Sequence, residues 1–95
     1  MTLEAIKSQL TYILKNHYAF NEYEYEDMFG GKVLKELDVD SIALLELFLV
    51  IEEGFNLKEK ISPRINMEKI MDSPVEKFID VVSLEVLKMY NDALR

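Results

Sequence analysis

Cysteine is absent from the sequence and histidine occurs once, and these two scarcities exclude several kinds of chemistry. Without cysteine the chain can form no disulfide and offers neither a thiolate nucleophile nor a cysteine ligand for a metal. A serine nucleophile would need His17 as its base, but the glycines that flank a catalytic serine on a sharp turn are missing. His17 ends an apolar helical stripe, where a structural role or an interaction with the helix dipole is more common than catalysis. We therefore expect that the protein is not an enzyme.

Positive charge and long apolar runs are also scarce. The chain has 11 Lys and Arg against 18 Asp and Glu, which gives a formal net charge of −7 at pH 7. A surface of this charge repels nucleic acid and anionic membranes, and it attracts partners with basic patches. The N-terminus shows no apolar signal segment, and no apolar run is long enough to insert across a bilayer. A cytoplasmic protein is the expectation.

The length and the apolar content bound the architecture. A chain of 95 residues, 49% of them hydrophobic, is expected to fold as a single domain over residues 1–95 with one core. Apolar residues recur mainly at helical spacing, and no internal repeat or linker interrupts them. We predict an all-α protein, a small four-helix bundle with an extended C-terminal helix. The predicted helices span residues 3–17, 41–53, 67–71 and 74–92.

Capping preferences mark two of the helix starts, and a loop separates the first two helices. Thr2 is predicted to cap the first helix. Ser73 and Glu76 form a capping box around Pro74, so the last helix should begin at Pro74. Residues 18–31, which alternate aromatic and acidic residues at their centre, are predicted as a loop anchored by tyrosines and ending in a glycine turn. A strand is the alternative there, but the chain offers no second strand to pair with it.

The stretch from Leu37 to Phe55 carries the strongest local signals. Ser41 stands where a polar approach changes into an apolar helix, and we predict that it is the N-cap. Asp38 and Asp40 place negative charge beside the positive end of the helix dipole, and Gly54 suits the end of the helix. The two aspartates also begin like a calcium loop, but the glycine and the glutamate that such a loop requires are absent. No metal site is therefore predicted.

The helix that begins at Ser41 has two apolar sides. One is predicted to face the core: Leu44, Leu47, Phe48 and Ile51. The opposite side mixes apolar and acidic residues: Ile42, Leu45, Glu46, Leu49, Glu52 and Glu53. This second side is either covered by another part of the chain or offered to a partner. We predict a docking surface, because apolar contacts supply affinity while acidic ones steer toward basic surfaces.

Four short motifs in this stretch follow a known order: Asp40-Ser41-Ile42, Glu46-Leu47, Ile51-Glu52-Glu53 and Phe55. Together they resemble the second helix of an acyl carrier protein, and the resemblance extends more weakly over residues 3–82. Many members of that family have glycine in place of Asp38 and leucine in place of Ile42. The segment 56–66 is also longer than usual, and the last helix extends further.

The resemblance implies a four-helix bundle of the acyl-carrier type with a 4′-phosphopantetheine arm, taken from coenzyme A, on Ser41. Asp40 would flank the attachment site. The arm's thiol would hold acyl or aminoacyl groups as thioesters. The acidic and apolar side of the helix would dock a phosphopantetheinyl transferase, a loading ligase, and downstream synthase or transferase enzymes. The chain would act as a stand-alone, monomeric carrier.

Two questions stay open at this point. The cargo could be a fatty acyl chain, a polyketide intermediate or an amino acid, although inward-facing Leu44 and Phe48 leave little room for a long chain and favour short or aminoacyl cargo. The alternative function is a small acidic helical adaptor, which would use the same side of the helix to bind a protein partner without any prosthetic group.

Overall fold

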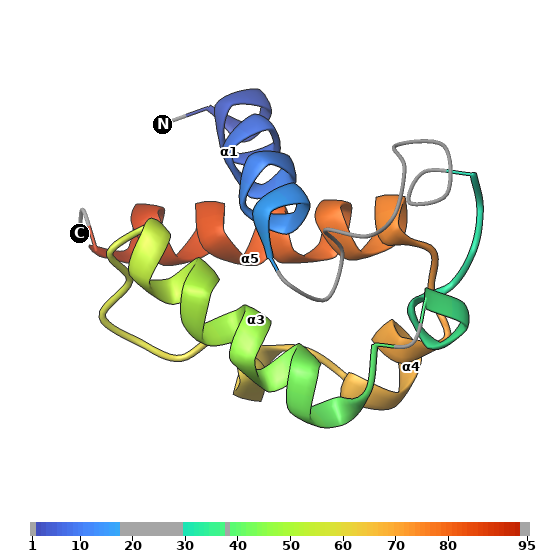
Figure 1. The fold of residues 1–95 in the computed structure, drawn as a ribbon. Helices are drawn as coiled ribbons and strands as arrows, with labels where there is room; N and C mark the ends of the chain where they lie inside the picture. Colours follow the sequence, from blue (N-terminus) through green and yellow to red (C-terminus); the bar gives the residue numbers. More distant parts are fainter. Residues whose placement is uncertain (1, 18–29, 38, 94–95) are drawn as a thin grey trace.

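The computed structural model describes residues 2–17, 30–37 and 39–93, and these residues form a small all-α bundle, as predicted (Figure 1). The elements are α1 (Leu3–Asn16), η1 (Leu34–Leu37), α3 (Ser41–Gly54), η2 (Ser62–Arg64), α4 (Met67–Met71) and α5 (Val75–Ala93), where η denotes a 3₁₀ turn. All four predicted helices are present, with ends within one residue of the predicted ones. Residues 18–29, most of the predicted loop, lie outside the described residues. Gly31 has a φ of 91°, which fits the predicted glycine turn.

The α1 helix packs across α5 and also contacts α3 (Figure 1). Thr2 caps it as predicted, since its side-chain oxygen accepts from the backbone N–H of Ala5 at 3.2 Å. Ile6, Leu10 and Leu14 lie on one face and are fully buried. This spacing explains why α1 forms and which side of it faces the core.

The α3 helix has the predicted core face but a different cap. The side chain of Asp40, rather than that of Ser41, accepts from the backbone N–H of Ala43, so Asp40 is the N-cap and Ser41 is the first helical residue. Both residue types are good caps, and the prediction placed the cap one residue too late. The four predicted core residues are all buried. One of them, Phe48, stacks against Phe78 of α5 with ring centroids 6.0 Å apart.

The α3 helix ends at Gly54, as predicted, but Gly54 is not the left-handed residue that stops it. The left-handed residue that ends the helix is Asn56, with a φ of 51°. Its N–H donates to the carbonyl of Glu53, and the N–H of Leu57 donates to the carbonyl of Glu52, which together form a Schellman motif. Gly54 serves a different purpose. A Cβ there would lie 2.8 Å from Cδ1 of Ile13, so glycine allows α1 and α3 to approach closely.

A short link joins η1 to the turn between α4 and α5. Val33 and Pro74 form an isolated antiparallel bridge, and the N–H of Leu34 donates to the carbonyl of Ser73. The hydroxyl of Ser73 donates to the carbonyl of Lys69 at 2.7 Å, and α5 begins at Val75 rather than at Pro74. The predicted capping box therefore gives way to a turn that closes α4. This link fixes η1 and α4 beside the start of α3.

Candidate functional site

Ser41 is exposed at the first position of α3. The carboxylate of Asp40 accepts from the backbone N–H of Ala43 at 2.7 Å, so the cap does not require the Ser41 hydroxyl. That hydroxyl makes no hydrogen bond with the described residues. It is therefore open to solvent, and to chemistry, at the positive end of a helix of 14 residues.

A hollow of about 440 Å³, which we call the Ser41 hollow, opens beside this residue. Its wall comes from η1, the start of α3, and α4: Lys35, Ser41, Met67, Glu68, Met71 and Asp72. The Nζ of Lys35 lies 2.9 Å from Oδ1 of Asp72, which joins η1 to the end of α4. The sequence alone does not place Lys35, Met67 or Met71 near Ser41, because their proximity depends on the link between η1 and the α4–α5 turn.

The outer side of α3 carries most of the predicted docking residues on its surface. Ile42, Leu45 and Leu49 are 66%, 48% and 50% exposed, so no described part of the chain covers them. Glu46 and Glu53 are also exposed. We call these five residues the α3 face. Val50, 41% exposed, borders the α3 face and was not predicted, because its position in the helix lies between the two sides.

The carboxylate of Glu52 is used within the chain, although Glu52 belongs to the predicted docking residues. The side chain is only partly exposed, and its Oε2 accepts from the backbone N–H of Ile61 at 2.7 Å. This bond holds the segment after α3 against the helix. Next to it, Leu45, Leu49 and Lys60 border a hollow of about 200 Å³ at the edge of the α3 face.

His17 lies buried at the C-terminal end of α1, at the edge of a hollow of about 470 Å³ between α1 and α3. Its backbone N–H donates to the carbonyl of Leu14, which ends the helix. Burial lowers the pKa of the imidazole, and the nearby carboxylate of Glu46 partly opposes that change. These features fit the predicted structural role.

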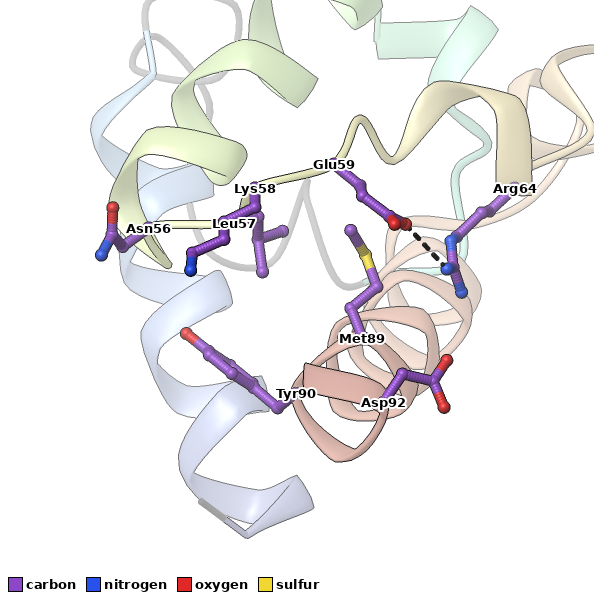
Figure 2. Close-up of a pocket in the computed structure, with 8 residues that line it drawn as sticks. All are labelled: Asn56, Leu57, Lys58, Glu59, Arg64, Met89, Tyr90 and Asp92. Carbon is purple, nitrogen blue, oxygen red and sulfur yellow. Dashed lines mark hydrogen bonds and ion pairs between the residues drawn. The ribbon is translucent and has the colours of Figure 1, made fainter. Parts of the chain in front are cut away.

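A further hollow, of about 190 Å³, lies between the segment after α3 and the last turns of α5 (Figure 2). Two of its charged groups, Glu59 and Arg64, pair with each other. Nη2 of Arg64 lies 3.1 Å from Oε2 of Glu59, a hydrogen bond that raises the pKa of Arg64, and Nη1 lies 3.6 Å from Glu85. The hydroxyl of Tyr90 donates to the backbone carbonyl of Phe55, and burial raises the pKa of Tyr90. This hollow is a gap where the segment after α3 packs against α5.

Three further findings concern metal binding, membrane-spanning helices and similarity to known proteins. Among the residues that the structure describes, no group of three or more His, Asp or Glu side chains is placed to hold a metal ion. No helix in the described ranges has the length and apolar character needed to cross a membrane. Comparison with protein-family models, curated proteins and solved structures found no match to this chain.

Proposed function

We propose that this protein is a carrier of the acyl or peptidyl carrier type, with a 4′-phosphopantetheine arm on the hydroxyl of Ser41. The observation that carries the proposal is that two different residues at the start of α3 provide the helix cap and the exposed hydroxyl. Asp40 caps the helix, while the neighbouring hydroxyl of Ser41 stays exposed and unbonded within the described residues. The resemblance of the stretch from Asp40 to Phe55 to the second helix of an acyl carrier protein supports the same assignment.

The residues around Ser41 suit such a group. A phosphodiester on Ser41 would meet the backbone N–H groups and the positive end of α3. The Ser41 hollow adds a cation, Lys35, and an apolar wall of Met67 and Met71. When bound, the arm supplies a thiol that holds an acyl or aminoacyl group as a thioester.

The α3 face is the docking surface in this proposal. Its exposed apolar side chains give contact area, and Glu46 and Glu53 favour basic grooves on partner enzymes. The partners expected are a phosphopantetheinyl transferase, a loading ligase, and downstream enzymes that use the cargo. Tethering raises the effective concentration of the cargo near each of these enzymes, and the chain contributes no bond chemistry of its own.

The test is the intact mass of the protein after incubation with coenzyme A and a broad-specificity phosphopantetheinyl transferase. The natural chain should gain one phosphopantetheine, mapped to Ser41 by fragmentation. Ser8→Ala, which removes an exposed hydroxyl from α1, should gain it equally, and Ser41→Ala should gain none. Modification of the Ser41→Ala variant would overturn the proposal, as would a folded natural chain that no transferase modifies.

The second candidate is a small helical adaptor, which the exposure of Ile42, Leu45 and Leu49 favours. An adaptor would bind its protein partner through the α3 face without a prosthetic group. Ser41→Ala separates the two functions, because it leaves the α3 face intact. An adaptor would keep its partner and its function in the cell, whereas a carrier would lose its function.

A further inference from the structure

We infer that the Ser41 hollow is the bed of the first part of the arm: Lys35 pairs with its phosphate, and Met67 and Met71 cover the dimethyl-substituted carbon that follows. This inference rests on the proposed function. Ser41 is itself part of the wall of the hollow, so any group esterified to its oxygen begins there. The phosphate of the arm matches the cation Lys35, and the branched apolar unit that follows it matches the apolar wall of Met67 and Met71.

The charges of the hollow give the arm a direction. Among the described residues that line it, Lys35 is the only cation, and the carboxylates of Glu68 and Asp72 belong to α4 and its C-cap. The ester bond holds the phosphate at Ser41, where Lys35 can exchange its pairing with Asp72 for the phosphate, and the carboxylate of Glu68 disfavours an anion further along α4. The uncharged unit that follows can then lie against the two methionines, whose flexible thioether side chains adapt to irregular shapes.

The ion pair between Lys35 and Asp72 does not prevent this exchange. Their side chains are 61% and 65% exposed, and exposed pairs of this kind contribute little to stability. A phosphodiester on Ser41 is a strong acceptor for an ammonium group and competes for it directly. Attachment of the arm is therefore expected to shift Lys35 from Asp72 to the phosphate.

The size of the wall limits what it can cover. The α4 helix has five residues, which at about 1.5 Å per residue span roughly 7.5 Å. This is enough for the phosphate and the branched carbon unit but not for the whole arm. The thiol end and its cargo would project from the hollow, within reach of enzymes docked on the adjoining α3 face.

Methionine methyl NMR tests the bed directly. The protein is labelled with ¹³C at the methionine methyl groups and measured before and after arm attachment, with attachment confirmed by mass. The Met67 and Met71 methyls, assigned with the single variants Met67→Leu and Met71→Leu, should shift and show nuclear Overhauser effects to the arm's dimethyl protons. The methyl of Met89, buried on α5 outside the hollow, should not.

Matched lysine variants test the phosphate contact. In Lys35→Gln the ³¹P resonance of the attached arm should shift and the Overhauser effects should be lost. Lys69→Gln, an exposed lysine of α4 outside the hollow, should leave both unchanged. Asp72→Asn should also preserve both, because it removes the competing carboxylate and keeps Lys35. This last variant separates loss of the cation from loss of the Lys35–Asp72 ion pair.

The outcomes distinguish failure of the contact between the arm and the Ser41 hollow from failure of the proposed function. A protein that gains the arm by mass, but whose Met67 and Met71 methyls neither shift nor contact the arm, overturns the bed and leaves the carrier function standing. The same holds if Lys35→Gln and Lys69→Gln behave alike. A folded protein that gains no arm overturns the proposed function itself.

Discussion

The carboxylate of Asp40 accepts a hydrogen bond from the backbone N–H of Ala43 at 2.7 Å, and this contact assigns the cap of α3 to Asp40. We expect Asp40→Ala to lower the free energy of unfolding by about 1 kcal/mol. Asp40→Asn should retain most of the stability, because asparagine is also a good cap. Urea unfolding followed by circular dichroism measures both changes.

Ser41→Ala is the matched comparison, since it alters the adjacent hydroxyl. It should change the free energy of unfolding by less than about 0.5 kcal/mol, because the hydroxyl makes no described hydrogen bond. If Ser41→Ala costs as much as Asp40→Ala, the cap is shared and the hydroxyl is not reserved for another purpose.

Glu52 and Glu53 are adjacent acids of α3 with different expected contributions to stability. Oε2 of Glu52 accepts from the backbone N–H of Ile61, whose side chain is fully buried, whereas Glu53 is exposed. Glu52→Ala should cost about 2 kcal/mol, because it leaves that N–H without its charged acceptor. Glu53→Ala should cost less than about 0.5 kcal/mol. Equal losses in urea unfolding would show that the bond to Ile61 contributes little.

Ser83 of α5 is fully buried, and its hydroxyl has no hydrogen-bond partner among the described residues. Ser83→Ala should therefore stabilise the fold by about 1 kcal/mol, since it removes an unsatisfied polar group. Ser83→Leu should destabilise it by about 2 kcal/mol, because a full core has no space for the larger side chain. Thermal unfolding of both variants checks the pair, and a loss of stability in Ser83→Ala would show that the hydroxyl is satisfied.

His17 gives the stability a defined pH dependence. Burial lowers the pKa of His17 in the folded protein, so the unfolded chain, with an ordinary value of about 6.5, binds the proton first as the pH falls. The free energy of unfolding should therefore decrease as the pH falls below about 6.5 and level off below the pKa of the folded state. At higher pH, His17 is neutral in both the folded and the unfolded state, and it does not contribute to the pH dependence of the free energy of unfolding.

His17→Gln tests this assignment because no other histidine titrates in the same range. The variant should show a flatter dependence of the free energy of unfolding on pH between about pH 5.5 and 7. Chemical denaturation at a series of pH values measures it. If His17→Gln keeps the same pH dependence as the natural chain, that dependence does not come from His17.

The sequence predicted the helices well because their signals are local. Apolar spacing defined the core side of α3, and the helix ends lay within one residue of those observed. The exact caps were harder. Asp40 and Ser41 are adjacent and both suited to capping, and only the backbone conformation decides between them. Gly54 was assigned to the helix stop, whereas the space that a larger residue would need there is filled by the side chain of Ile13, a residue far away in the sequence.

The Ser41 hollow could not be predicted in the same way. Ser41 and the acidic motifs stand together in one stretch, but Lys35, Met67 and Met71 come from two other elements. They meet Ser41 because the segment of η1 pairs with the turn after α4, through the bridge between Val33 and Pro74 and the hydrogen bond from Leu34 to Ser73. Such a contact leaves no periodic pattern in the sequence.

The acidic residues of the α3 face provide the test of docking. Glu46→Lys and Glu53→Lys should each slow arm attachment by roughly tenfold at low salt, because they place a positive charge opposite a basic partner. The difference from the natural chain should shrink as salt is added, since exposed charges are screened. Glu76→Lys makes the same change at an exposed position near the start of α5, away from the α3 face, and should leave the rate unchanged. Because Glu46 also influences the pKa of His17, Glu53 is the cleaner probe of the two. Equal rates for Glu53→Lys and Glu76→Lys at low salt would mean that the transferase approaches Ser41 from another side, and the α3 face would then lose its assigned role.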